Sequence, residues 1–120
     1  MRILSFTDEG AELIGDFGSS GAAAVNLAMG YGETHAYAVY FEPGGLIGPH
    51  QAGFAQLFIV VGGQGWVASE DGVKHPIAAG QLAHIEKGEV HSKGSDGGMS
   101  AIMLQVTDLV AQVSLPTYLA

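Results

Sequence analysis

The chain has 120 residues, 48% of them hydrophobic and 13% charged, and it contains no cysteine. This composition excludes a disordered chain and supplies one hydrophobic core, so we expect a single domain over residues 1–120. The net charge of -8 argues against nucleic acid as a partner, and the lack of cysteine leaves only nitrogen and oxygen atoms as metal ligands.

No apolar run approaches the ~20 residues that a membrane helix needs. The first residues, MRILSFTDEGAELIGDF, contain no sustained apolar region either. We therefore expect a cytoplasmic protein without a membrane partner.

Residues 1–21 are expected to form an N-terminal arm. Two short apolar pieces, at 3–4 and 13–14, are separated by acidic and glycine residues. One short strand in this arm would lie against the rest of the domain or against a second subunit. A further strand is predicted over residues 22–29, and Gly30 is expected to end it.

The segment from 35 to 42 is the clearest early strand, because it is rich in aromatic and β-branched residues. Side chains alternate in a strand, so His35, Tyr37 and Val39 share one face. Both faces are largely apolar, as in a strand inside a barrel or at a subunit contact. We interpret His35 as a strand-edge histidine at such a contact, and together with the arm this strand suits a homodimer interface.

Asp71-Gly72 separates two extended runs, 64–69 and 73–77, and predicts a hairpin. The next strands are expected at 81–85 and 90–93. A last core strand is predicted over 99–106, where the residues are mostly apolar.

The order of short strands and glycine turns predicts an all-β jelly roll of two antiparallel sheets. The barrel core would span about residues 22–106, and residues 107–120 would form a C-terminal tail. Apolar residues in this tail have a spacing compatible with a helix: Leu109, Val110, Val113 and Leu115.

The stretch from Pro43 to Gly65 has the spacing of a known metal-binding motif. The motif positions are occupied by Gly44, His50, Ala52, Gln56 and Gly63. The gaps between them are five, one, three and six residues long. This resembles the first motif of the cupin superfamily, in which Ala52 would be a second histidine and Gln56 a glutamate.

A second stretch resembles the other cupin motif. Gly80, Gly88 and His91 match it, whereas Glu86 stands for a proline and Ser95 for an asparagine. The resemblance covers roughly residues 43–95 and implies a small RmlC-like jelly-roll barrel with a degenerate metal motif.

Cupins with both motifs complete hold a divalent metal inside the barrel with three histidines and a glutamate. The resemblance therefore implies His50, Gln56 and His91 as possible ligands of zinc, nickel or iron. A neutral amide at Gln56 lowers the affinity for a dication, and it can hydrogen-bond a small molecule instead. Glu89, two residues before His91, is either a replacement carboxylate or a solvated turn residue.

Two further residues are candidates for ligand binding. His84 is either a pocket-wall histidine with a binding or general-base role or a packed histidine with its own hydrogen-bond partner. Trp66, the one tryptophan in the chain, is either an apolar pocket wall or part of a subunit contact.

Three functions remain open on these grounds. The first is a barrel that binds a small polar molecule, with a weakly bound metal or none. The second is a metal-dependent enzyme, an oxygenase or isomerase, that uses His50 and His91 with Gln56 or Glu89. The third is a non-catalytic assembly or regulatory barrel filled by Phe54, Phe58, Trp66 and Met103.

Overall fold

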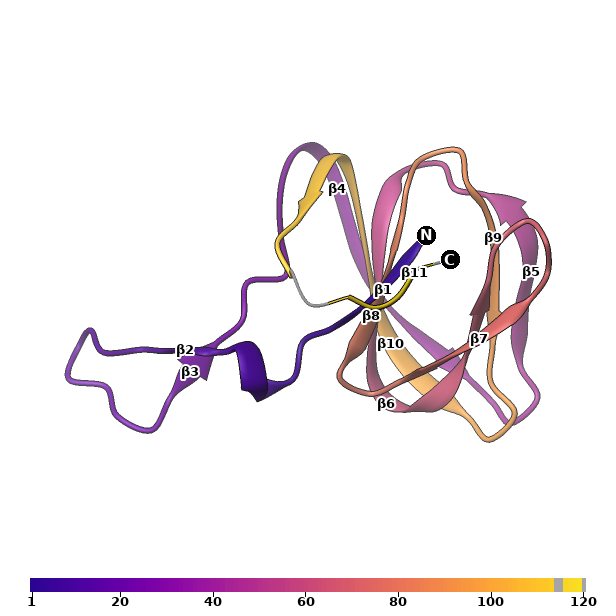
Figure 1. The fold of residues 1–120 in the computed structure, drawn as a ribbon. Coiled ribbons are helices and arrows are strands. Elements are labelled where there is room, and N and C mark those ends of the chain that lie inside the picture. Colours follow the sequence, from indigo (N-terminus) through magenta and orange to yellow (C-terminus); the bar gives the residue numbers. More distant parts are fainter. Residues whose placement is uncertain (114–115, 120) are drawn as a thin grey trace.

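The structure is a computed structural model that describes residues 1–113 and 116–119, and the fold is all-β (Figure 1). Every paired strand is antiparallel to its neighbour. The strands are β1 (Arg2–Ser5), β2 (Glu12–Leu13), β3 (Ala23–Ala24), β4 (Ala28–Phe41), β5 (Leu46–Gln51), β6 (Ala55–Ala68), β7 (Lys74–Ala78), β8 (Gln81–Ile85), β9 (Val90–Gly94), β10 (Met99–Ala111) and β11 (Pro116–Leu119).

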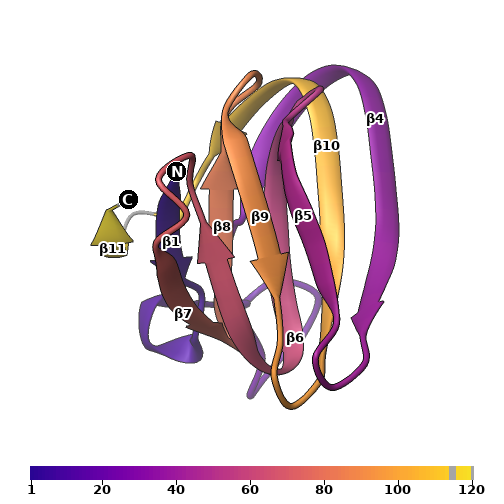
Figure 2. The same cartoon turned by 90° about the vertical axis from the view of Figure 1, so that its right-hand side faces the viewer.

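Two sheets face each other, as expected for a jelly roll, and β6 belongs to both. Its first part pairs with β8 and β10 in a sheet of order β11-β1-β8-β6-β10-β4. Its last part, from Gln64 to Ala68, pairs with β7 and β9, and β9 also pairs with β5. Figure 2 shows β5 and β9 side by side in front of β10 and β4.

The space between the sheets is the main core. Along β6, Phe58 and Val60 point into it, and both are fully buried. The alternate residues Leu57 and Ile59 lie on the outer face of the sheet, in a second cluster with Leu82. Partly buried residues cover this second cluster, among them Phe6, Val25 and Leu27 from the N-terminal region.

The short strand expected in the N-terminal arm is β1, and it pairs with β8 on the barrel. The chain then leaves the barrel, passes through a short 3-10 turn, Asp8–Gly10, and forms the ribbon of β2 and β3. This ribbon projects to the left in Figure 1. The arm is therefore anchored at its start and extends from the barrel afterwards.

The prediction that glycine ends a strand at Gly30 is wrong, because β4 continues through it. β4 shifts register against β10 between Val106 and Asp108. Gly32 has a φ of 97°, and a Cβ on Gly30 would lie 2.6 Å from Val106 Cγ1. These glycines thus permit a bulge and a close strand contact rather than a turn.

The spacing that suggested a helix in the C-terminal tail is also misleading. Leu109 and Val110 lie in β10, which pairs with β4 as far as Ala111. β11 pairs with β1, whereas Leu115 falls outside the described residues. Within residues 1–113 and 116–119, no helix is long and apolar enough to span a membrane.

Candidate functional site

The first motif segment forms two strands with a short connection between them. β5 ends at Gln51 and β6 begins at Ala55. The Ala52 N–H donates to the Glu89 carbonyl oxygen at 2.9 Å, and the Ala52 carbonyl accepts from the Gly88 N–H at 2.8 Å. These bonds hold the turn, so His50 and Gln56 belong to strands of opposite sheets.

The two motif histidines lie next to each other. The register of β5 and β9 places His50 opposite His91, with ring centroids 4.3 Å apart. His50 is exposed, and its Nδ1–H donates to the Gly48 carbonyl oxygen at 2.8 Å. His91 is 1% exposed. The pairing of β5 with β9 therefore brings the two motif histidines together.

A lysine that sequence reasoning did not single out lies inside the barrel beside His91. Lys93 is 1% exposed, and its Nζ lies 3.0 Å from His91 Nδ1 and 4.9 Å from the Phe58 ring centroid. The one signal in the sequence was its position two residues after His91, which places both side chains on the same face.

The charges of this pair follow from burial. Burial lowers the pKa of Lys93 to about 8. Burial, followed by the charges of Lys93 and His50, lowers the pKa of His91 to about 3. At neutral pH the Lys93 ammonium therefore donates to a neutral His91, whose proton is then on Nε2. That Nε2 is buried and has no hydrogen-bond partner.

A cavity of about 340 Å³ lies between the two sheets at this point. Gln56 Nε2 donates to the Phe54 carbonyl oxygen at 3.1 Å, and Gln105 Nε2 donates to the Tyr37 hydroxyl at 3.2 Å. Apolar and aromatic walls with a few polar groups are typical of small-molecule sites. The lining residues are Tyr37, Ala38, Val39, Tyr40, Ile47, His50, Gln56, Lys93, Met103 and Gln105.

These residues do not fit the metal site that the motif resemblance implies. The Lys93 ammonium occupies His91 Nδ1 and would repel a dication beside it. Ala52 offers no donor and Gln56 only a neutral amide. In the described part of the chain, no three His, Cys, Asp or Glu side chains gather in a metal-binding group.

Glu89 is engaged elsewhere and does not act as a substitute ligand in this arrangement. Its Oε2 lies 2.8 Å from the Met1 amino group, and its Oε1 accepts from the Glu86 N–H at 3.0 Å. Burial alone would raise the pKa of Glu89, but these two hydrogen bonds lower it overall. Its carboxylate therefore stays ionised and holds the turn between β8 and β9.

His84 lies away from the cavity, on the outer face of the first sheet. It stands opposite Leu57 and Arg2 in the pairing of β8 with its neighbours, and its Nδ1 lies 2.9 Å from an Arg2 guanidinium nitrogen. Burial, then the nearby Arg2 charge, lowers the pKa of His84. Of the two alternatives for His84, the packed histidine with its own hydrogen-bond partner matches this placement. The alternative of a histidine in the wall of the barrel cavity does not.

Trp66 also lies outside the barrel cavity. It stands opposite Gly94 and Pro76, and the Lys74 ammonium lies 4.5 Å from its ring centroid. It lines a separate hollow of about 510 Å³ together with Pro76 and Asp96. The interpretation of Trp66 as a wall of the barrel pocket is therefore corrected.

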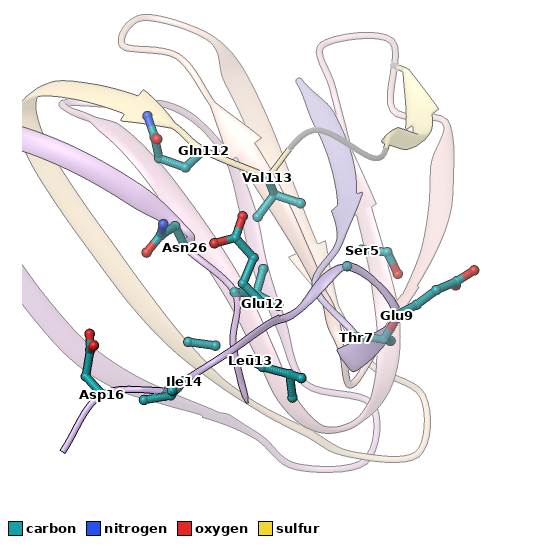
Figure 3. A pocket seen from close by; sticks show the side chains of 14 residues that line it. Ser5, Thr7, Glu9, Glu12, Leu13, Ile14, Asp16, Asn26, Gln112 and Val113 are labelled. Carbon is teal, nitrogen blue, oxygen red and sulfur yellow. The ribbon is translucent and has the colours of Figure 1, made fainter. Parts of the chain in front are cut away.

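A larger hollow, of about 680 Å³, lies between the arm and the end of β10 (Figure 3). Three carboxylates line it, those of Glu9, Glu12 and Asp16. Figure 3 shows the Glu9 side chain pointing away from that of Glu12. Because the acidic groups do not converge, this hollow offers no binding centre comparable to the cavity around Lys93.

Comparisons with known proteins agree with the fold. A family model described as a cupin domain matches residues 37–107. Among solved structures, an RmlC-like cupin family protein from Methanocaldococcus jannaschii matches with a TM-score of 0.60 and 11% identity, over 82% of this chain and 89% of that chain. No curated protein matches the sequence.

Two proteins from Thermotoga maritima also match. One is a cupin-like protein, with a TM-score of 0.59, 23% identity and coverage of 68% of this chain and 65% of that chain. The other is a predicted oxalate decarboxylase, with a TM-score of 0.55, 23% identity and coverage of 60% and 64%. The chain thus spans about two thirds of each, and at these identities the likeness concerns the fold.

Proposed function

Because this chain belongs to the cupin domain family, whose model matches residues 37–107, we propose that it binds a small polar molecule inside its barrel with weak or no dependence on a divalent metal. The observation that carries the proposal is the cavity of about 340 Å³ into which His50, Gln56 and Lys93 reach from three different strands. Its volume is near the lower end of the ~300–1,000 Å³ of ordinary ligand pockets.

The low dependence on metal is proposed because of Lys93. An ammonium 3.0 Å from His91 Nδ1 occupies one of the two ring nitrogens through which this histidine could bind a metal, and it adds a positive charge beside the ring. Repulsion between like charges at such distances is strong inside a protein, where water does not screen it.

A metal-dependent enzyme is the second candidate, and the contact between the rings of His50 and His91 favours it. The reaction named for the Thermotoga maritima neighbour belongs to that protein, with 23% identity to this chain. An assembly or regulatory barrel is the third candidate. Phe58 and Met103 do fill part of the core, but Trp66 lies outside it and a cavity remains beside Met103.

A measurement on two methionine side chains tests the binding proposal. Met103 lines the cavity, whereas Met29 is exposed at the start of β4. With labelled methionine methyl groups, uncharged polar compounds such as amides and diols are expected to shift the Met103 signal and leave the Met29 signal in place. The proposal fails if no compound moves Met103 at millimolar concentration.

Elemental analysis of protein purified without a metal-affinity tag tests the metal dependence. We expect well below one equivalent of zinc, nickel or iron, unchanged in His50→Ala. About one equivalent, lost in both His50→Ala and His91→Ala, would instead establish the metal-dependent candidate.

We also propose that the chain forms a homodimer through the outer face of β4 and its neighbours. Tyr40 is 80% exposed there, and Ile102 and Val61 are exposed nearby. An edge strand with exposed apolar side chains is a common contact between subunits. Light scattering is expected to give twice 12.3 kDa. Val61→Glu should raise the dimer dissociation constant at least ~tenfold, and Val73→Glu on the β6–β7 turn should leave it unchanged.

A further inference from the structure

The barrel contains a buried positive charge without a negative partner. All twelve acidic residues lie in the part of the chain that the structure describes. Neither of the two ion pairs found there involves Lys93, although this side chain is 1% exposed. Its hydrogen-bond partner is the His91 imidazole, which carries no negative charge in either protonation state and so cannot compensate the ammonium. A buried charge in this state is unfavourable unless a group of opposite charge joins it.

Lys93 lines the cavity, so its charge can interact with a ligand bound there. Lys93 is the one lysine or arginine among the lining residues, and no aspartate or glutamate is among them. Two other cations are held elsewhere: Arg2 contacts His84 on the outer face, and Lys74 stacks over Trp66. The cavity wall therefore contains one lysine side chain and no carboxylate, in a chain with a net charge of -8.

We propose that the cavity binds small monocarboxylates, with the Lys93 ammonium as the partner of the carboxylate and His91 as the residue that positions Lys93. This inference rests on the binding function proposed above and names its ligand class. One cation balances one negative charge, which favours a carboxylate over a phosphate dianion. The side chains of Tyr37, Val39 and Met103 give the ligand an apolar surface, so its body is short and apolar.

The site differs from a metal-centred one in how it selects its ligand. A metal binds any good donor atom that reaches it, including neutral ones. An ammonium buried between apolar walls gains most from a full negative charge, because only such a charge removes the cost of its burial. A carboxylate should therefore be preferred strongly over an amide of the same shape.

The experiment uses the full chain and matched probe pairs: butyrate beside butyramide, and phenylacetate beside phenylacetamide. Binding is followed by the Met103 methyl signal. We expect each acid to bind at least ~tenfold more tightly than its amide. In Lys93→Met the acids should lose that advantage and the amides keep their affinity. Lys74→Met removes the same charge from the outer surface and should change neither.

The outcomes separate this inference from the proposed function. If acids and amides bind unmodified protein equally, or if Lys93→Met binds the acids as before, the cavity binds ligands but the carboxylate assignment is wrong. Inorganic phosphate binding more tightly than every acid would overturn it too. If no probe of either kind moves Met103, the binding function itself fails. The comparison of acid with amide in the unmodified protein holds even if Lys93→Met does not fold.

Discussion

Acidification from neutral pH to about pH 4.5 is expected to lower the free energy of unfolding by about 2 to 3 kcal/mol through His91 alone. The ordinary pKa of histidine is 6.5, and in the folded barrel that of His91 is about 3. Between these values the unfolded chain binds a proton at His91 that the folded chain does not. Stability therefore falls as the pH falls through this window.

Urea unfolding at a series of pH values measures this effect. Carboxylates also contribute to acid unfolding, so the informative quantity is the difference between unmodified protein and His91→Asn. Asparagine keeps an oxygen that can accept from Lys93 but does not titrate. The difference in unfolding free energy between the two proteins should change by about 2 to 3 kcal/mol from neutral pH to about pH 4.5. His50→Asn, at the exposed neighbour, should retain the wild-type fall. Parallel profiles for unmodified protein and His91→Asn would show that His91 is solvated.

Much of the fold was predictable because it depends on local patterns. The Asp71-Gly72 turn indicated its hairpin, which the structure contains between β6 and β7. The strand expected over residues 81–85 is β8 with the same bounds. Turn residues and alternation act over a few positions, so the sequence near them is sufficient. The positions of His50 and His91 opposite each other likewise follow from motif spacing that matches the cupin fold.

The parts that were not predictable depend on contacts between distant segments. β10 continues to Ala111 because the start of β4 lies beside it, and the spacing of Leu109 and Val110 does not reveal that partner. Alternation along β8 indicates which residues share a face with His84. Which of the two faces lines the barrel depends on the pairing of β8 with β1 and β6.

Lys93 is the most consequential residue that the pattern did not identify. A lysine in a strand ordinarily lies at the surface, but this one is buried because its side chain is directed at Phe58 in the core between the sheets. The cupin motifs specify the metal-ligand positions, and position 93 is not one of them. The chemistry of the cavity was therefore set by a position that the motif does not include.

Raising the pH from about 7.5 to 9.5 is expected to stabilise the unmodified protein by about 2 kcal/mol relative to Lys93→Met. The ordinary pKa of lysine is 10.5, and burial lowers that of Lys93 to about 8. Between these values the unfolded chain holds a proton on Lys93 that the folded chain has released. Because the unfolded state then binds more protons, stability increases with pH.

Tyrosine ionisation and repulsion among the carboxylates also change in this range, but both proteins share them, so they cancel in the difference. Lys74→Met provides the matched control, since Lys74 lies over Trp66 outside the barrel and its removal should give no such change. A difference that stays constant with pH would mean that Lys93 remains protonated in contact with water. The barrel would then lack the unpaired buried charge from which the preference for a carboxylate follows, and the selectivity would lose its physical cause.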